Sequence, residues 1–403
     1  MVKLFRITSG LIPLAAGLLL IAPANSGRVR LGVEVLIAQN YAPLVGKRVG
    51  LITNHTGRTA TGESTIDVLA QAPGVKLVAL FAPEHGLEGT IEGRPVPAGC
   101  EPRTGLPIHS LYGATLRPTD AMLAEVDVLV FDIQDAGVRF YTYITTMAYA
   151  MEEAARRKIA FVVLDRPNPL NGLAVQGPML DPGCSSFVGY FPMPIRHGMT
   201  VGELAQMFNA ENKISADLTV IPLQGWRREL WFDETGLEWI RPSPNLCSLR
   251  GATLYPAIEL LRAGGVSVGR GTATPFELSG APWIRSEELL SYLRSRNIPG
   301  VHFEPVHFQP SKDVHAGEVC YGLRLQTTDR SRLDIGWLGV ELLAALHKFY
   351  PQEFRLEKTL HLLGSTRTLE RIRAQDDPRE IVAGWEAELE AFKRLRRRYL
   401  LYD

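Results

Sequence analysis

Four apolar stretches of this 403-residue chain each stop abruptly at side chains that can do chemistry. The clearest is GVKLVALFAPEHGLEG at 74–89, where the apolar run ends at Glu84 and His85, between Pro83 and Gly86. The other stretches end in the same way, at Asn54 with His55, at Asp132 with Asp135, and at Asp165 with Arg166. Parallel strands of an open α/β sheet bind ligands beyond their carboxyl ends, so these endings predict one shared site.

Carboxylates and arginines dominate the side chains near these endings. Glycoside hydrolysis fits this set, because one carboxyl group must protonate the leaving oxygen while a second group stabilises or attacks the cationic anomeric carbon. Glu84 is the first candidate for the acid. Aromatic side chains around the motifs would offer flat apolar surface to a sugar ring. The arginines of this set are Arg139, Arg166, Arg196 and Arg270.

Several common chemistries lack their usual motifs. No GxGxxG opens the first strand–helix unit and no GxxxxGK[ST] occurs, so the glycines that hold a pyrophosphate are missing and no nucleotide cofactor is expected. Neither GxSxG nor HExxH is present, which removes the usual support for a serine hydrolase or a zincin. The histidines and the four cysteines do not pair at metal-ligand spacing, so no metal site is expected.

The composition and the first residues predict an exported globular protein. Lysine plus arginine equals aspartate plus glutamate at 43 each, so no overall charge favours nucleic acid or an anionic membrane. Residues 1–24 predict a cleaved signal peptide, because Lys3 and Arg6 precede an apolar stretch and the small residues at 22–24 offer a cleavage site. We expect a periplasmic or secreted protein, with no stable membrane insertion after cleavage.

The elements that must position these side chains alternate between strand and helix. This alternation predicts βαβ units and a mostly parallel, Rossmann-like sheet. The predicted strands are Arg48–Thr53, Lys76–Phe81, Asp127–Asp132 and Ile159–Asp165. The predicted helices are Thr65–Gln71, Thr119–Glu125, Tyr143–Arg157, and one that runs from the capping box of Thr200 and Glu203 through Asn209.

A second domain is expected after a connector at 222–250 that is rich in tryptophan, proline and arginine. Its predicted elements are helices Ala257–Ala263, Ser286–Arg296 and Gly336–Phe349, strand Gly322–Thr327 and a final helix Glu380–Tyr399. The predicted domains are therefore residues 25–250 and 251–403.

The motifs also resemble, in order and spacing, those of the exo-β-N-acetylmuramidase family called NamZ. The similarity runs from about Gly32 to the C-terminus, and the motifs are specific when taken together. They are GLITNHTG at 50–57, LFAPEHGLEG at 80–89, GLPIHSLYG at 105–113, VFDIQDAGVRFYTYITTM at 130–147, LDRPNPLNG at 164–172, PMPIRHGMTVGELA at 192–205, SPN at 243–245 and SVGRGTATPFELSGAPWI at 267–284.

The resemblance implies a Rossmann-like N-terminal domain, a smaller α/β (α+β) C-terminal domain and an active-site cleft between them. It implies an enzyme that releases single β-1,4-linked N-acetylmuramic acid residues from the non-reducing ends of peptidoglycan fragments. Its partners would be muropeptides or disaccharides. Glu84 of the PEHG motif is the residue carried over as catalytic, with His85 beside it to orient the carboxyl group. The predicted export agrees, because peptidoglycan lies outside the cytoplasm.

The roles of the other residues stay open at this point. Asp132 or Asp135 could act as the nucleophile, or the substrate's own N-acetyl group could attack the anomeric carbon. The lactyl carboxylate of muramic acid requires a bidentate cation, for which the four arginines named above are candidates. The other predicted substrate-binding residues are Asn54, His55, Tyr141 and His197.

Two other classes of protein would share some of these features. A non-catalytic periplasmic muropeptide-binding protein would have two domains and an export signal, but it would not need Glu84. A peptidoglycan amidase or esterase would instead need a metal ion or an activated serine.

Overall fold

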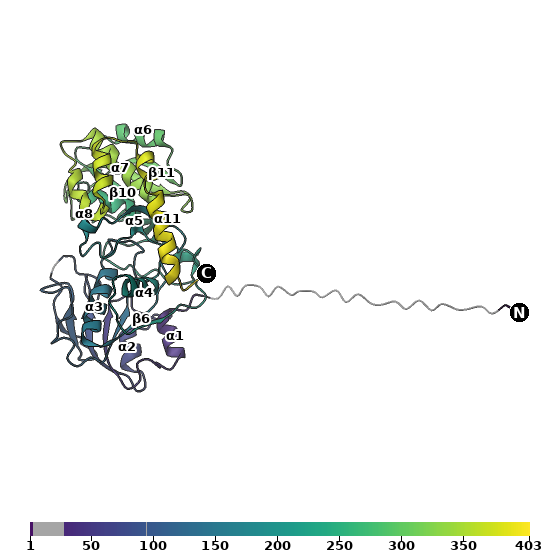
Figure 1. The fold of residues 1–403 in the computed structure, drawn as a ribbon. Helices are drawn as coiled ribbons and strands as arrows, with labels where there is room; N and C mark the ends of the chain where they lie inside the picture. The colour runs from purple at the N-terminus through teal and green to yellow at the C-terminus, as the bar shows by residue number, and fades with distance from the viewer. Residues whose placement is uncertain (3–27, 94) are drawn as a thin grey trace.

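The computed structural model describes residues 1–2, 28–93 and 95–403 (Figure 1). The predicted signal peptide, residues 1–24, lies outside the described residues except for its first two. The elements form an N-terminal part, α1 to β9, and a C-terminal part, α5 to α10, which Figure 1 shows one above the other. Within the described ranges no helix is long and apolar enough to cross a membrane, and the four cysteines are free thiols.

A seven-stranded sheet forms the centre of the N-terminal part and confirms the predicted mostly parallel, Rossmann-like architecture. The strand order is β3-β4-β2-β1-β5-β6-β9, in which only the edge pair β3 and β4 is antiparallel. The strands are β1 (Arg48–Thr53), β2 (Lys76–Ala82), β3 (Gly99–Cys100), β4 (Pro107–Ser110), β5 (Val128–Asp132), β6 (Ala160–Leu164) and β9 (Leu218–Ile221).

Helices cover both faces of this sheet, because successive strand side chains point to opposite faces. Ile52 and Phe131 belong to the apolar cluster that includes helices α3 and α4. Leu51 and Val130, one residue away in each strand, belong to a second cluster with α1 and α2. The helices are α1 (Gly32–Ala38), α2 (Thr65–Ala70), α3 (Tyr143–Arg157) and α4 (Val201–Glu211).

Helix α4 begins at the capping box that the sequence predicts. Thr200 Oγ1 accepts a hydrogen bond from the backbone N–H of Glu203 at 3.3 Å, and Glu203 Oε2 accepts one from the N–H of Thr200 at 3.0 Å. These reciprocal bonds satisfy two N–H groups that the first turn of a helix leaves without partners. Before α4, a short hairpin of β7 (Gln176–Met179) and β8 (Pro194–Arg196) encloses the 3₁₀ turn η1 (Pro182–Cys184).

The C-terminal part is built on a three-stranded antiparallel sheet with the order β10-β12-β11. Its long helices α5 and α7 pack against each other in the same apolar cluster as α3. From β9 to the C-terminus the elements in chain order are η2 (Phe232–Glu234), α5 (Leu249–Arg262), β10 (Leu278–Ala281), α6 (Ser286–Arg296), β11 (Val301–Phe308), β12 (Cys320–Thr327), α7 (Ile335–Phe349), η3 (Leu356–Thr359), α8 (Leu360–Leu363), α9 (Thr366–Arg373), α10 (Pro378–Ala383), α11 (Glu386–Arg396) and η4 (Arg397–Tyr399).

Three predicted helices differ from the structure. The predicted helix Thr119–Glu125 is wrong, because this segment forms only a turn before β5 begins. The N–H of Leu123 donates to the carbonyl of Thr119, and the N–H of Val126 donates to the carbonyl of Leu123. The predicted helix Ala257–Ala263 is the second half of α5.

The predicted final helix Glu380–Tyr399 is interrupted between α10 and α11, at Gly384 and Trp385. The Trp385 ring is buried and donates its indole N–H to Thr368 Oγ1 at 3.1 Å. Packing of this one side chain outweighs the helical periodicity around it.

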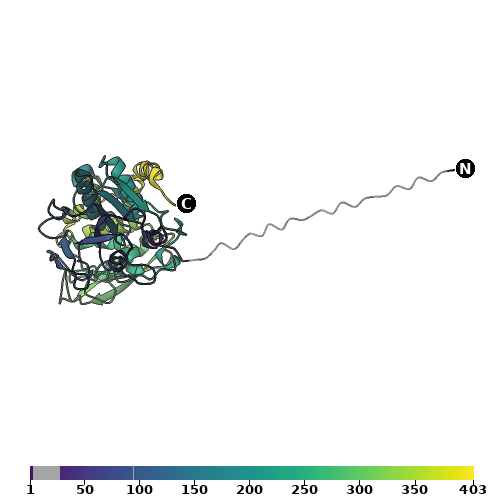
Figure 2. The ribbon, with the colours of Figure 1, turned by 90° about the horizontal axis from the view of Figure 1, so that it is seen from below.

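After α11 the chain runs back beside α4 of the N-terminal part (Figure 1). Tyr402 donates its hydroxyl hydrogen to Asp165 Oδ2 at 2.5 Å, and the N–H of Leu401 reaches Glu203 Oε1 at 2.9 Å. The view from below shows this yellow segment at the outside of the molecule (Figure 2). The two parts are therefore joined by contacts that are distant in sequence.

Candidate active site

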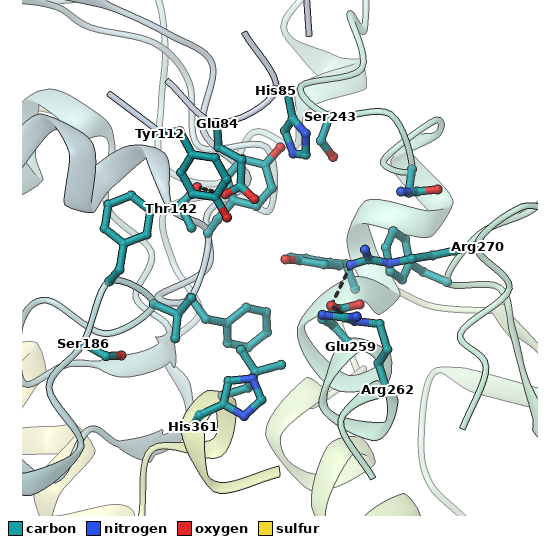
Figure 3. A pocket seen from close by; sticks show the side chains of 18 residues that line it. Glu84, His85, Tyr112, Thr142, Ser186, Ser243, Glu259, Arg262, Arg270 and His361 are labelled. Atoms are coloured by element: carbon teal, nitrogen blue, oxygen red, sulfur yellow. Dashed lines mark hydrogen bonds and ion pairs between the residues drawn. The ribbon is translucent and has the colours of Figure 1, made fainter. Parts of the chain in front are cut away.

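A cavity of about 410 Å³ lies between the two parts (Figure 3). The N-terminal part lines it with the loop after β2, with Tyr112 in the segment after β4, with the segment that enters α3 and with residues 186–188 between β7 and β8. The C-terminal part lines it with α5, the loop before β10 and α8. Lining residues that bear on the chemistry are Glu84, His85, Tyr112, Tyr141, Thr142, Tyr255, Glu259, Arg262, Arg270, Phe276 and His361.

Glu84 and His85 reach this cavity because the chain turns sharply at the end of β2. The N–H of Gly86 donates to the carbonyl of Pro83 at 3.0 Å, which closes the turn. His85 has a φ of 73°, a left-handed conformation that is uncommon for a residue with a side chain. Nδ1 of His85 donates to the carbonyl of Ile91 at 2.7 Å, which leaves Nε2 as the nitrogen that a ligand can meet.

Thr142 holds the carboxylate of Glu84. Thr142 Oγ1 donates to Glu84 Oε2 at 2.5 Å, and Thr142 is also the N-cap residue of α3. The carboxyl group therefore lies beside the first turn of a 15-residue helix. Among the described residues no hydrogen bond joins His85 to Glu84, so the residue that orients Glu84 is Thr142 rather than the predicted His85.

Tyrosines form the apolar floor of the cavity. The ring of Tyr141 meets the ring of Tyr143 edge-on at 4.9 Å between centroids and that of Tyr255 at 6.0 Å. Burial raises the pKa of Tyr255 well above its usual range, and the negative charges of Glu259 and Glu84 raise this pKa further. The Tyr255 phenol therefore stays protonated, and both carboxylates lie near it.

The wall opposite Glu84 carries a cluster of charged side chains (Figure 3). Glu259 of α5 accepts hydrogen bonds from Arg270 Nη2 at 2.6 Å and from Arg262 Nε at 2.8 Å. Asp313 lies within 3.5 Å of both guanidinium groups. The guanidinium groups are thereby held in fixed orientations, and each side chain is partly exposed toward the cavity.

Asp132 and Arg166 do not line the cavity, although both follow strand ends as predicted. Arg166 donates from Nε to Asp132 Oδ1 at 2.5 Å and from Nη2 to Oδ2 at 3.0 Å, and Thr65 Oγ1 donates to Oδ2 at 2.5 Å. These side chains lie beyond β1 and β5, where the strand order reverses and nucleotides bind in related sheets.

Asp135 also lies outside the cavity and is almost fully buried. Its Oδ2 accepts a hydrogen bond from the N–H of Gly137 at 2.6 Å. Burial raises the pKa of Asp135 to about 7 because the charged form loses its hydration. Neither aspartate that was predicted as a nucleophile therefore faces the cavity.

Arg139 is buried and binds backbone carbonyl groups instead of a ligand. Its Nη1 donates to Pro178 and Met193 at 2.9 Å each, and its Nη2 donates to Leu362 and Leu363 at 2.8 Å each. Burial lowers its pKa to about 9. Because Leu362 lines the cavity, Arg139 positions the wall from behind.

Arg196 and His197 are likewise buried away from the cavity. Arg196 donates from Nη2 to the carbonyl of Leu170 and from Nη1 to Gln176 Oε1 at 3.1 Å. Burial and nearby arginines lower the pKa of His197 to about 3, so its ring is neutral at physiological pH. Both residues support the fold at the β8 end.

Asn54 and His55 line a separate polar cavity of about 340 Å³ at the end of β1. Asn54 Oδ1 accepts the N–H of Thr56 at 2.9 Å, and His55 Nε2 donates to the carbonyl of Arg241 at 2.7 Å. A Cβ atom at Gly89 would lie 1.9 Å from the His55 ring, so this glycine is required for the contact. His55 therefore supports the Glu84 loop from its far side.

Of the predicted site residues, the structure brings Glu84, His85, Tyr141 and Arg270 together at one cavity. Sequence reasoning missed Thr142, Tyr255, Glu259, Arg262 and His361. Thr142 had a local signal, because it directly precedes the predicted helix Tyr143–Arg157. Glu259 and Arg262 look like an ordinary ion pair on a helix, at i and i+3. In residues 28–93 and 95–403, no three histidine, cysteine, aspartate or glutamate side chains are grouped to hold a metal ion.

Comparisons with known proteins agree on one family. Residues 49–250 match the N-terminal region of the exo-beta-N-acetylmuramidase NamZ family, and residues 253–402 match its C-terminal region. The chain is 43% identical over 383 residues to the peptidoglycan beta-N-acetylmuramidase NamZ of Bacillus subtilis (strain 168), covering 94% of this chain and 92% of that protein.

Two crystal structures of DUF1343 family proteins from Bacteroides fragilis NCTC 9343 have the same fold. The first has a TM-score of 0.87 and 38% sequence identity, and the match covers 93% of this chain and 99% of the chain in that structure. The second has a TM-score of 0.76 and 32% sequence identity, and the match covers 94% of this chain and 99% of the chain in that structure.

Proposed function

Because the chain belongs to the exo-beta-N-acetylmuramidase NamZ family, we propose that it is a glycoside hydrolase that releases N-acetylmuramic acid from the non-reducing ends of peptidoglycan fragments. The observation that carries this proposal is Glu84, a carboxylate fixed by Thr142 at the edge of a cavity with an aromatic floor. A cavity of about 410 Å³ suits a small substrate group rather than a long glycan strand.

Glu84 is the proposed general acid. It would donate its proton to the glycosidic oxygen as the bond from that oxygen to the anomeric carbon breaks, and in the second step it would take a proton from water. The pocket's other carboxylate, Glu259, is engaged by two guanidinium groups, which makes it a poor nucleophile. We therefore favour attack by the substrate's own acetamido oxygen on the anomeric carbon, a documented alternative to a carboxylate nucleophile.

Arg270 and Arg262 are the proposed readers of the lactyl carboxylate. Of the four arginines predicted for this role, only Arg270 lines the cavity, and Arg262 lies beside it. Their charges are balanced by Glu259 and Asp313, so their contribution is a set of directed N–H donors in planar forks. This arrangement supports selection of muramic acid over glucosamine, which lacks the lactyl group.

The site of action is proposed to lie outside the cytoplasm, in the periplasm or the medium. The sequence pattern of residues 1–24 supports export, and the proposed muropeptide or disaccharide substrates derive from a polymer outside the cytoplasm.

The deciding experiment incubates the purified protein with a chromogenic aryl β-N-acetylmuraminide and, in parallel, with the matching glucosaminide. We expect release of the chromophore from the muraminide only. Binding of muropeptides without release would indicate a binding protein. Release of peptide or acetate with intact glycosidic bonds would indicate an amidase or an esterase.

A further inference from the structure

Glu92 links the loop that carries Glu84 and His85 to the C-terminal part, which faces this loop across the cavity (Figure 3). Its Oε1 accepts hydrogen bonds from Lys312 Nζ at 2.6 Å and from Asn245 Nδ2 at 3.1 Å. Lys312 belongs to the segment between β11 and β12, and Asn245 lines the cavity just before α5. Among the described residues of the loop, no other side chain makes a hydrogen bond or an ion pair with the C-terminal part.

On one side of this link, short contacts lead back to Glu84. Ile91, the residue before Glu92, is bound to His85 twice. Its carbonyl accepts a hydrogen bond from Nδ1 of His85 at 2.7 Å, and its N–H donates to the carbonyl of His85 at 3.2 Å. Because His85 directly follows Glu84, a shift of Glu92 reaches Glu84 through a short, hydrogen-bonded stretch of backbone.

On the other side, contacts lead from Lys312 to Arg270. The N–H and the hydroxyl group of Ser311 donate to the carbonyl of Gly271 at 3.3 Å and 2.8 Å. A Cβ atom at Gly271 would lie 2.6 Å from the backbone nitrogen of Lys312, so the two segments are in direct contact. Oδ2 of Asp313 lies 3.5 Å from Nε of Arg270. Lys312 is therefore fixed relative to the arginine of the cavity wall.

The link is exposed, so its effect on stability should be small. Burial acts to raise the pKa of Glu92, but Lys312, Asn245 and Arg270 together lower this pKa below its usual value. The side chains of Lys312 and Glu92 are 43% and 39% exposed. An exposed ion pair shifts an equilibrium by a factor of only about two to five. Replacement of either residue should therefore alter the alignment of the loop without unfolding the protein.

We infer that Glu92 is a positioning residue, whose ion pair with Lys312 holds the Glu84 loop in register with the opposite wall of the cavity. This inference rests on the proposed function, in which a sugar bound at that wall receives a proton from Glu84. Arg270 keeps its hydrogen bond to Glu259 without Glu92. Loss of the link should therefore leave sugar binding almost unchanged and lower the fraction of enzyme in which Glu84 can protonate the leaving oxygen.

The test measures kcat in Glu92→Gln and in Lys312→Met. Glutamine can still accept the hydrogen bond from Asn245, and methionine keeps most of the length of lysine, so the ion pair is the main loss in both variants. We expect kcat for a disaccharide to fall about two- to fivefold, and kcat for an aryl muraminide, whose leaving group needs no proton, to fall less. The Kd for N-acetylmuramic acid should stay close to the wild-type value.

Two further variants show whether the ion pair itself is responsible. The charge-reversed double variant Glu92→Lys with Lys312→Glu should restore kcat for the disaccharide, because it rebuilds the pair and the amide of Asn245 can turn its oxygen to the new lysine. Arg398→Gln is the matched control. Arg398 and Glu211 form another exposed ion pair between distant segments, at 2.8 Å, and neither residue lines the cavity, so this variant should keep the wild-type kcat.

The outcomes separate this inference from the proposed function. If the wild type hydrolyses neither substrate, the proposed function fails. If the wild type is active but both single variants keep its kcat for the disaccharide, or lose equally for both leaving groups, the inference is overturned while the function stands. An equal loss in Arg398→Gln, or no recovery in the double variant, would also overturn it. Should one single variant fail to fold, the other decides, since both break the same pair.

Discussion

Replacement of Glu84 by glutamine separates proton transfer from the shape of the site. The amide keeps a carbonyl oxygen that can accept the hydrogen bond from Thr142 Oγ1, which is 2.5 Å long in the native enzyme. The loop after β2 keeps its turn and its contact between His85 and Ile91. The variant loses only the proton that Glu84 would give to the glycosidic oxygen.

The expected loss follows from this single missing step. General acid catalysis typically contributes about 10² to 10⁴ in rate, which corresponds to about 3 to 5 kcal/mol of transition-state stabilisation. We expect kcat for a disaccharide, whose leaving sugar needs a proton, to fall by a factor in this range. For an aryl leaving group that departs as a stable anion, the loss should be much smaller.

The assay measures kcat for both substrates in Glu84→Gln and in Glu88→Gln. Glu88 is the matched control, because it belongs to the same loop but is exposed and lines the separate cavity beside Asn54. Thermal unfolding of each variant checks that the fold is intact. A disaccharide kcat within about threefold of the wild type would remove Glu84 from the mechanism, and equal losses for both leaving groups would refute its role as an acid.

Four further predictions concern specificity, stability and metal dependence. Arg262→Lys and Arg270→Lys keep the charge but lose the planar fork, so the kcat/KM preference for a muraminide over a glucosaminide should fall about tenfold or more; an unchanged ratio in both would exclude them as readers. Asp135 keeps its proton in the folded protein up to about pH 7, whereas the unfolded chain releases it near pH 4, so the wild type loses stability as the pH rises between these values. The stability of Asp135→Asn relative to wild type, measured by denaturant unfolding, should therefore grow over this window by up to about 4 kcal/mol, and a constant difference would contradict the reasoning. Asp132→Asn leaves the Arg166 guanidinium buried without its anion and should lower the free energy of unfolding by about 3 to 5 kcal/mol; a loss below about 1 kcal/mol would mean that the charge is compensated elsewhere. Dialysed enzyme should hydrolyse the muraminide at full rate in excess chelator, and activity that disappears on chelation and returns with zinc would contradict the expectation that hydrolysis needs no metal ion.

The sheet and its loops could be predicted from the sequence because their signals are local. An apolar run that stops at a polar pair marks both a strand and its carboxyl end, as at Glu84, and Thr200 with Glu203 marks a helix start. Strand β11 gave no such signal, since Pro305 interrupts it. The structure tolerates this proline because β11 lies at the edge of its sheet.

The residues of the site could be predicted only in part, because the type of a residue does not reveal which group its side chain binds in the folded protein. Asp132 and Arg166 follow strand ends as Glu84 does, yet they satisfy each other in the interior and never reach the cavity. Arg139 and Arg270 were equivalent candidates in the sequence, and only the fold distinguishes them. Glu259 lies far along the chain from Glu84, so only long-range packing of α5 brings the two carboxylates to one cavity.

The buried guanidinium of Arg139 makes the two parts of the molecule a single cooperative unit. Its four hydrogen bonds end on carbonyl groups near the β7–β8 hairpin and at the end of α8. Separating the parts would break the two bonds to Leu362 and Leu363 and leave the buried guanidinium without half of its acceptors, which is costly for a desolvated charge. We expect heat to unfold both parts in one transition, with few intermediates that could expose strand edges and aggregate.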